Sequence, residues 1–387
     1  MNARKFFALL LSTAVLTAAC SDNDAEFVAV PPPEPPIDGQ ATFRFDTYGD
    51  EAFWTDVLRF NEVVTTISPE TALAVGLKVD AEAVPADVLA SADLTDPATT
   101  VALLELDAVV GIKAEVATDG TVTRFGVTCA LCHSDVDNSV APGIGVRQDG
   151  WPAKDLDPGL IISLSPFFDD KPSLRAELQS WGPGMYDPYW NLDGISDPVV
   201  IAPAYGLKDV PLETYTGEGP VSYWNAYVAI TQMGGQGNFV EPALNIEVHA
   251  DPDLVTPKLP ALLAYQESLD SPPPPLDSYD LEAAERGKVL FDGKAGCSGC
   301  HSGDTFTDAG TTLHEAHEIG ADPLYATRTI TKRYRTTPLR ALWQHPPYYH
   351  NGEFGTLAEV VEHYDLVRNL GLAADEKADL EEYLRSL

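Results

Sequence analysis

Two five-residue stretches decide the fold of this chain: CALCH at residues 129–133 and CSGCH at residues 297–301. Both follow the pattern C-x-x-C-H, in which two cysteines lie on one side of a helical turn and a histidine comes directly after them. This is the attachment motif of a c-type haem, in which each thiol bonds one of two vinyl groups along an edge of the porphyrin. The sequence therefore predicts two covalently bound haems.

The residues of these motifs have separate roles. The cysteines hold the porphyrin, and each histidine lies under the iron as its proximal ligand, which leaves the sixth position of each iron to be filled. The predicted residues are Cys129, Cys132 and His133 for the first haem, and Cys297, Cys300 and His301 for the second.

Three other uses of paired cysteines stay open. A thiol redox pair favours a thioredoxin-like βαβ context and does not need the histidine. A zinc site usually brings two C-x-x-C pairs within roughly 15–20 residues of each other, whereas 164 residues separate Cys132 from Cys297. A disulfide within either motif would close a short and strained loop. Two complete motifs favour haem over all three.

The composition is globular, with 44% hydrophobic and 21% charged residues, and the length of 387 residues suits two or three domains. The formal net charge of −35 argues against nucleic acid or an anionic membrane surface as a partner. A small cationic protein that donates or accepts electrons is compatible with this charge. Solubility alone would also explain most of it.

Residues 1–20 have the pattern of a lipoprotein-type signal peptide, with Arg4 and Lys5 before an apolar run and Cys20 after small residues at a cleavage site. We expect a lipid on Cys20, which would explain the one cysteine outside the haem motifs. The acidic and proline-rich residues 21–41 would form a tether. The protein would then lie in the periplasm or cell envelope, held at a membrane only by the lipid. If Cys20 is not modified, we expect a soluble periplasmic protein.

Hydrophobic periodicity predicts a mainly α chain with long ordered loops around the haems. Strands at 112–116 and 122–127, with Gly120 in the turn, would form a hairpin that leads into the first motif. Residues 99–110 fit either a helix or a strand. The predicted helices span residues 50–66, 69–77, 223–233, 259–269, 281–291 and 375–387.

The run of prolines at 272–275 marks a boundary between two predicted domains. We predict an N-terminal haem domain at 42–270, a proline-rich linker at 271–280 and a C-terminal domain at 281–387. A helix before the haem motif and another at the end of the chain are the layout of a class I cytochrome c. The predicted fold therefore has two such cytochrome c-like haem domains.

The C-terminal part contains TPLR at 337–340, PYYHNG at 347–352 and TLAEVVEHY at 356–364. These stretches resemble the bacterial di-haem cytochrome c peroxidases, the related MauG-type enzymes and the di-haem rubber oxygenases. The resemblance is specific over 281–387 and weaker over 42–270. It implies one haem in each domain, with one iron that receives electrons and another, open iron that reacts with peroxide.

The resemblance also implies a sixth ligand for the C-terminal haem. Tyr364 stands where the peroxidases have a methionine, and a tyrosine at this place is similar to MauG-type enzymes. A phenolate oxygen would stabilise ferric iron and lower its reduction potential. His350 is the main alternative ligand, and His345 and His363 are close in sequence. Tyr364 could also be an aromatic residue that only packs at the end of a helix.

Candidate ligands are scarce around the first haem. Met185 and Met233 are the only methionines after Met1, and we prefer Met233, which ends an aromatic helix before a glycine-rich turn. Either could instead fill space in the core. Without such a ligand the first iron is open, as peroxide or oxygen activation requires. Glu213 and Glu241 are the candidate catalytic residues, since the family often uses a glutamate to move a proton between the oxygens of peroxide.

Three further groups are weaker candidates, each with a plain structural alternative. The tryptophans that could carry electrons between the haems, or simply pack, are Trp181, Trp190 and Trp224. The residues that could bind calcium, or form a solvated loop, are Asp135, Asp137 and Asn138. His314 and His317 have a spacing that could bind a metal but lack further obvious ligands.

We therefore expect an exported di-haem oxidoreductase in which electrons enter at one haem and the open haem reduces hydrogen peroxide or activates oxygen. A pure electron carrier with two six-coordinate irons is one alternative, which the scarcity of ligands near the first haem disfavours. An oxygenase of a carbon substrate is another, which the apolar and aromatic loops after His133 permit. The lack of methionine at position 364 weakens the plain peroxidase function.

Overall fold

A computed structural model describes residues 36–387 of this chain. The predicted signal peptide, the lipidation site Cys20 and most of the predicted tether lie outside the described residues. Residues Ile37–Leu387 form one compact unit. Helix α1 (Gly39–Phe45) begins within the predicted tether range and buries Thr42 and Phe43, so helical structure starts before residue 42.

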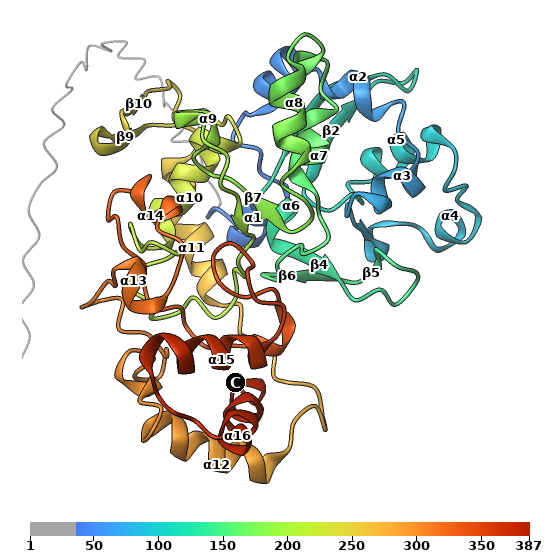
Figure 1. Cartoon of the computed structure of the whole chain (residues 1–387). Coiled ribbons are helices and arrows are strands. Elements are labelled where there is room, and N and C mark those ends of the chain that lie inside the picture. The colour runs from blue at the N-terminus through green and yellow to red at the C-terminus, as the bar shows by residue number, and fades with distance from the viewer. Residues whose placement is uncertain (1–35) are drawn as a thin grey trace, which may run out of the picture. The chain divides into compact units, whose positions relative to one another are not determined.

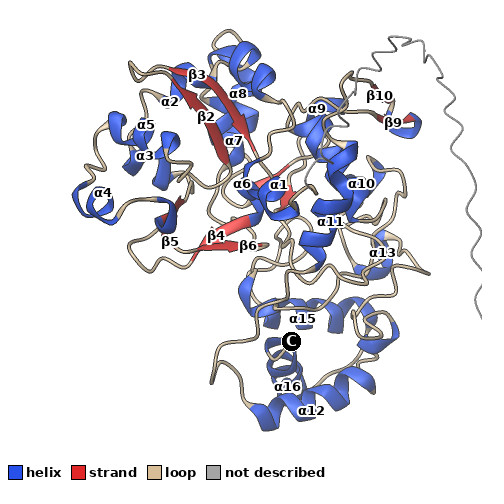
Figure 2. Cartoon of the chain, turned by 180° about the vertical axis from the view of Figure 1, so that it is seen from behind, coloured by secondary structure: helices blue, strands red, loops and turns tan. Residues whose placement is uncertain are grey.

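Helices dominate the described residues, which confirms the mainly α fold class, and the strands are short and join only in pairs (Figure 2). One pair is parallel, β1 (Val79–Asp80) with β5 (Ile144–Gly145). The antiparallel pairs are β2 (Ile112–Val116) with β3 (Val122–Val127), β4 (Ser134–Val136) with β6 (Arg147–Asp149), β7 (Met185–Tyr186) with β8 (Val199–Val200), and β9 (Phe239–Glu241) with β10 (Ile246–Val248).

Most α-helices are short and lie among long loops (Figure 1). After α1 they are α2 (Phe60–Val64), α3 (Pro69–Ala74), α4 (Ala86–Ser91), α5 (Pro97–Glu105), α6 (Ala130–His133), α7 (Pro158–Ser163), α8 (Pro172–Gln179), α9 (Trp190–Asp193), α10 (Val221–Tyr227), α11 (Leu259–Glu267), α12 (Leu281–Asp292), α13 (Ala316–Ile319), α14 (Leu324–Thr327), α15 (Leu357–Arg368) and α16 (Ala374–Arg385). Between residues 36 and 387, none of the helices has both the length and the apolar character needed to span a membrane.

The hairpin β2–β3 is confirmed with the predicted bounds, and the predicted helices at 69–77, 223–233, 259–269, 281–291 and 375–387 are confirmed in α3, α10, α11, α12 and α16. A π-helical segment, Val228–Gln232, continues α10. The ambiguous range 99–110 forms a helix, α5, followed by a loop.

The single helix predicted at 50–66 is wrong. Arg59 takes a left-handed conformation with φ of 60° and separates a π-helix, Ala52–Val57, from α2. The break lets the Trp54 and Phe60 rings pack 5.3 Å apart, with Phe60 stacked 5.5 Å from Phe125 of the hairpin. Tertiary packing on the hairpin therefore overrides the helical periodicity.

Helices α12, α15 and α16 gather at one end of the described unit, around the C-terminus (Figure 1). They share a hydrophobic cluster that includes Phe291, Val361, Leu380 and Tyr383. The backbones of α12 and α16 cross closely at Gly287, where a Cβ atom would lie 2.0 Å from the carbonyl oxygen of Asp379. Only glycine permits this approach.

A larger hydrophobic cluster extends from Tyr48 through the hairpin and α10 to residues 321–334, which follow the second haem motif. Ala321, Tyr325, Ala326 and Tyr334 thus belong to the core that is otherwise built from residues before 256. The segment between the second motif and α15 therefore packs against the N-terminal part of the chain. The division into two haem domains stays a prediction.

Candidate haem sites

The first haem motif follows directly on the hairpin. Strand β3 ends at Val127, and α6 places Cys129 and Cys132 within one turn. Burial raises the pKa of the Cys129 thiol to about 11 and that of Cys132 to about 12. Both are free thiols and not disulfides. Thiols with a raised pKa are poor redox nucleophiles, so the structure disfavours a thiol redox pair here.

The histidine of this motif is fixed by a backbone carbonyl. The Nδ1 atom of His133 lies 3.0 Å from the carbonyl oxygen of Ala202, 69 residues further along the chain. Burial lowers the pKa of His133, which keeps the ring neutral. With Nδ1 donating to the carbonyl, Nε2 carries the lone pair that an iron ligand needs.

The second motif has the same arrangement. Cys297 and Cys300 flank a short 3₁₀ turn and are free thiols, and burial raises the pKa of Cys297 to about 11. The Nδ1 atom of His301 lies 3.1 Å from the carbonyl oxygen of Thr337 and 3.3 Å from that of Phe306. Burial lowers the pKa of His301 to about 4, so its Nε2 is also available to a metal.

The two carbonyls that hold the histidines share a sequence context. Ala202 precedes Pro203, and Thr337 precedes Pro338 in the TPLR stretch. The residue before a proline is restricted to extended conformations, so its carbonyl direction is well defined. The histidine of each motif is thus oriented by a rigid X-Pro segment distant from that motif.

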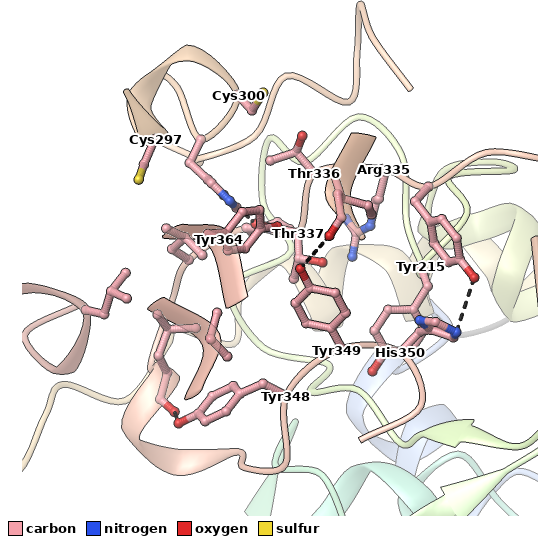
Figure 3. A pocket seen from close by; sticks show the side chains of 18 of the residues that line it. Tyr215, Cys297, Cys300, Arg335, Thr336, Thr337, Tyr348, Tyr349, His350 and Tyr364 are labelled. Atoms are coloured by element: carbon pink, nitrogen blue, oxygen red, sulfur yellow. Dashed lines mark hydrogen bonds between the residues drawn. The ribbon is translucent and has the colours of Figure 1, made fainter. Parts of the chain in front are cut away.

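A cavity of about 300 Å³ opens beside the second motif (Figure 3). Cys297 and Cys300 lie at one end of it, and His350 and Tyr215 lie at the other. Its wall is mostly apolar and includes Val200, Ile201, Leu339, Val361, Leu372 and Leu380. Ala202 also lines it, so the residue that holds His133 faces the cavity of the other motif.

Tyr364 lies in this cavity on α15, close to Cys297 and Cys300 (Figure 3). Its ring is 6.1 Å from that of Tyr349. Burial raises the pKa of the Tyr364 hydroxyl, so the phenolate form needs a cation in front of it. A ferric iron held by His301 would be such a cation.

The histidines named as alternatives have other partners. The Nε2 atom of His350 lies 3.2 Å from the Tyr334 hydroxyl, and its ring packs among Tyr215, Tyr325 and Tyr334. Burial lowers the pKa of His350 to about 4. His345 lines the cavity with its Nε2 atom 3.2 Å from the carbonyl oxygen of Arg340.

The Nε2 atom of His363 lies 3.0 Å from the carbonyl oxygen of Ile319. His314 also lines the cavity and groups with Asp308 and Cys300, with ligand atoms within 4.8 Å of one another. In a haem site, however, Cys300 is used by the thioether bond. His317 is exposed.

The two candidate glutamates are not brought together. Glu213 lines the cavity, where its Oε2 lies 3.2 Å from Arg335, and burial raises its pKa. Its Oε1 is buried with no hydrogen-bond partner in the described part of the chain. Glu241 instead ends β9 and accepts a hydrogen bond from the Ala243 backbone. The structure thus places Glu213, and not Glu241, in the cavity beside the second motif.

The candidate methionine and tryptophans lie in the core. Met233 is buried, and its carbonyl accepts a hydrogen bond from the Trp54 indole at 2.9 Å. Trp181 packs edge-on against Tyr186 and Trp190. Trp224 packs against Tyr227 at 5.2 Å.

The proposed calcium residues are engaged in other contacts. The Lys78 ammonium lies 3.9 Å from Asp135. The Asp137 carboxylate accepts hydrogen bonds from the backbone N–H groups of Ser139 and Val146. The Asn138 side-chain oxygen accepts a hydrogen bond from the backbone N–H of Gly143. These contacts close the loop before β5, so calcium binding stays a prediction.

Sequence reasoning missed several charged groups. Arg335 and Arg340 line the cavity beside Glu213. Arg340 belongs to the TPLR stretch, so the sequence could have indicated it as a site residue. No motif in the sequence includes Arg335. Asp50, near the first motif, is fully buried, and burial raises its pKa to about 9.

The donor set at both motifs fits a c-type haem. Each has two unoxidised thiols and a neutral histidine with a free Nε2 atom, and the second has an apolar cavity beside them. Arginines at the cavity wall suit the anionic propionate groups of a haem.

No protein-family model matches the chain. Among characterised proteins, it is 36% identical over 118 residues to the methylamine utilization protein MauG of Methylorubrum extorquens, covering 27% of this chain and 33% of MauG. It is 32% identical over 181 residues to the cytochrome-c peroxidase IdrP1 of Pseudomonas sp. (strain SCT), covering 33% of this chain and 48% of the relative. The chain thus spans between a third and a half of the length of these relatives.

A solved MauG-like protein associated with microbial copper homeostasis matches 34% of this chain and 56% of its own, at 23% identity and a TM-score of 0.28. A TM-score this low does not establish a shared fold.

Proposed function

Because a segment of this chain is related to the di-haem cytochrome c peroxidase and MauG superfamily, we propose that the chain is a di-haem c-type redox enzyme. When bound, a haem supplies an iron that changes its valence and accepts an oxygen ligand. In this proposal Cys129 and Cys132 hold one porphyrin, and Cys297 and Cys300 hold the other.

The observation that carries the proposal is the pair of carbonyl–histidine contacts. Ala202 and Thr337 fix the Nδ1 atoms of His133 and His301 at 3.0 and 3.1 Å, and each Nε2 is left free. Such an outer hydrogen bond orients a histidine ligand and raises its basicity. A thiol redox pair would need neither histidine.

In this proposal Tyr364 would be the sixth ligand of the haem held by Cys297 and Cys300. The haem held by Cys129 and Cys132 would be open, with Met233 filling space in the core. Tyr364 is half-buried in the cavity close to Cys297, and a phenolate ligand stabilises ferric iron. The C-terminal haem would then receive electrons, and the first haem would reduce hydrogen peroxide or activate oxygen.

The position of Ala202 supports electron transfer between the two sites. It lines the cavity of the second motif, while its carbonyl oxygen accepts the hydrogen bond from His133. One residue therefore links the wall of the C-terminal haem site to the proximal ligand of the first haem. We propose that electrons pass through this contact.

Location and partner are part of the proposal. Residues 1–20 have the features of an export signal with Cys20 as a lipid-accepting residue. Export would bring the chain to the compartment where bacteria attach haem covalently. The net charge of −35 is compatible with a small cationic protein as electron donor or acceptor.

The test is an electron paramagnetic resonance spectrum of the oxidised, haem-loaded chain, combined with the rate of peroxide reduction. We expect one high-spin and one low-spin ferric signal, and turnover of peroxide with an added electron donor. Two low-spin signals that persist after partial reduction, without turnover, would instead indicate an electron carrier. A chain that takes up no haem would contradict the proposal altogether.

One observation favours oxygenation of a carbon substrate as a second candidate. The loops after the first motif carry packed aromatic side chains, among them Trp181, Tyr186 and Trp190, which suit an apolar substrate. Oxygen consumption in the presence of an alkene polymer, without peroxide, would distinguish this function from peroxide reduction.

A further inference from the structure

A continuous set of aromatic rings leads from the cavity of the second motif into the core. His350, which lines the cavity, has its ring centroid 5.7 Å from that of Tyr325. Tyr325 lies 5.7 Å from Tyr189, and Tyr189 lies 6.0 Å from Tyr227. These are distances of direct ring contact. An electron can therefore move between the cavity and Tyr189 in short steps from ring to ring.

Tyr189 differs from its neighbours in the partner of its hydroxyl. The Tyr189 hydroxyl donates to Oε2 of Glu218 at 2.6 Å. Tyr227 instead donates to the backbone carbonyl of Pro188, which cannot take up a proton. The Tyr223 hydroxyl is buried and has no hydrogen-bond partner within residues 36–387. Of these three tyrosines, only Tyr189 has a base to receive its proton.

Glu218 is held in place to act as that base. Its carboxylate also accepts hydrogen bonds from the Ile330 backbone at 2.9 Å and the Thr216 hydroxyl at 3.3 Å. Burial raises the pKa of Glu218 above that of a surface glutamate, so it binds a proton more readily. Burial also raises the pKa of Tyr189 well above its usual value. The phenol therefore does not ionise by itself, and its proton leaves only together with an electron.

The cation near the Tyr189 ring is neutralised by acidic partners. The Arg328 guanidinium lies 5.7 Å from the ring centroid, and an isolated cation there would oppose removal of an electron. Arg328 is paired with Asp187 at 3.0 Å and with Asp193 at 2.8 Å. The two carboxylates offset the cation, so oxidation of Tyr189 is not opposed by a net positive charge.

We propose that Tyr189 and Glu218 form an internal electron-donor pair for a peroxide-oxidised haem. The proposal rests on the proposed function, which supplies hydrogen peroxide as the oxidant. Tyr189 would give one electron through Tyr325 and His350 to the cavity of the second motif, and the Ala202 contact would carry it on to the first haem. The Tyr189 O–H bond breaks, and the proton moves to Oε2 of Glu218. A neutral tyrosyl radical is left on Tyr189, and the oxidised haem would take up the electron. An external reductant returns the electron, and Glu218 returns the proton.

The experiment measures the radical separately from the peroxide reaction. In one arm the haem-loaded chain reacts with one equivalent of hydrogen peroxide, is frozen within milliseconds and is examined by electron paramagnetic resonance, while peroxide consumption is recorded. In the other arm a photogenerated ruthenium(III) polypyridyl complex oxidises the protein without peroxide. Ring-deuterated tyrosine in the unmodified sequence narrows the signal if the radical is on a tyrosine.

We expect a tyrosyl signal in both arms that Tyr189→Phe abolishes. Glu218→Gln should slow its formation about 100-fold, because the amide keeps the hydrogen bond but cannot take the proton. Tyr223→Phe is the matched control and should keep the signal, since Tyr223 lies in the same cluster, 6.5 Å from Tyr227, without a proton acceptor. Haem content and circular dichroism confirm that each variant is folded.

The outcomes separate the two proposals. If peroxide is consumed but the radical is absent or persists in Tyr189→Phe, the donor pair is wrong and the proposed function stands. If peroxide is not consumed and the ruthenium arm yields a radical that depends on Tyr189, the pair is redox-active and the proposed function is wrong. A radical that forms at the same rate in Glu218→Gln would exclude Glu218 as the proton acceptor.

Discussion

At the scale of single residues, burial decides the protonation state of the cysteines and histidines in the two motifs. It keeps the four motif cysteines as neutral thiols and the rings of His133 and His301 uncharged. Backbone carbonyls then select the tautomer that leaves Nε2 free. A metal or haem iron that approaches meets ligands already in the form it needs.

The role of Tyr364 predicts a change in potential. Tyr364→Met should raise the reduction potential of the C-terminal haem by on the order of 0.1 V, within the ~0.8 V range that axial ligands span. Tyr364→Phe should convert its ferric signal from low-spin to high-spin, because the ring then offers no ligand atom. A potentiometric titration and a resonance spectrum measure both effects.

The matched control for this prediction is Tyr348→Phe. Tyr348 lines the same cavity, but its hydroxyl donates to the Leu342 carbonyl. This variant should leave the spectrum and the potential unchanged. Wild-type behaviour of both Tyr364 variants would show that another residue binds the iron.

Asp50 predicts a dependence of stability on pH. Burial raises the pKa of its carboxyl from 3.8 to about 9, so the folded chain keeps a proton that the unfolded chain loses. The stability that depends on this proton is complete below about pH 4 and is lost as the pH rises toward 9. Over this range the free energy of unfolding falls by about 1.4 kcal/mol for each pH unit.

Urea denaturation between pH 5 and 8 tests this dependence. Asp50→Asn should remove this slope, so the variant gains stability relative to wild type as the pH rises. Asp87→Asn is the control, because Asp87 is exposed on α4. If the curves of wild type and Asp50→Asn run parallel, the buried carboxyl is not protonated.

At the scale of elements, the position of the cavity beside the second motif depends on how α12, α15 and α16 meet. Thr356 and Glu359 form a capping box that fixes the start of α15 and so the position of Tyr364 along it. Helices α12 and α16 cross at Gly287 and enclose Phe291 and Tyr383, whose rings lie 5.1 Å apart.

The crossing at Gly287 predicts a large effect of one methyl group. Gly287→Ala would place a Cβ atom 2.0 Å from the Asp379 carbonyl oxygen. The helices must separate, and we expect a loss of about 1–3 kcal/mol in the free energy of unfolding. Gly355→Ala, which would meet only the Glu359 carboxylate at 3.5 Å, should change it by less than about 0.5 kcal/mol. If Gly287→Ala and Gly355→Ala change the free energy of unfolding equally, the two helices can move apart without loss of stability.

At the scale of the whole described unit, the C-terminal and N-terminal parts of the chain share a core. Residues 321–334 pack into the large hydrophobic cluster, and Arg328 pairs with Asp187 and Asp193. The Arg328 side chain is only 3% exposed and that of Asp187 is 0% exposed. These ion pairs of Arg328 hold the α14 region beside Tyr189 and the cavity.

Removing the Arg328 cation from these ion pairs should lower the free energy of unfolding substantially. Arg328→Gln leaves the buried carboxylate of Asp187 without its cation, and we expect a loss of about 3–5 kcal/mol in the free energy of unfolding. Arg385→Gln removes an exposed i,i+4 pair with Glu381 and should cost at most about 0.5 kcal/mol. Chemical denaturation monitors both. A small loss for Arg328→Gln would indicate that the carboxylates reach water or bind protons.

The sequence by itself determined the two haem motifs, the hairpin β2–β3, and helices α12 and α16. These features follow from covalent pattern and local periodicity, which need no information about distant residues. The same periodicity was misleading at residues 50–66, where packing of Trp54 and Phe60 on the hairpin outweighed local helical preference.

Only the tertiary structure decided which residues share a site. It brought the Ala202 carbonyl to His133 across 69 residues and the Thr337 carbonyl to His301 across 36. It also placed Glu213 in the cavity and Glu241 elsewhere, although the sequence treated the two alike. The physical reason is that backbone carbonyls carry no sequence signature, and burial depends on contacts between segments that only the folded chain brings together.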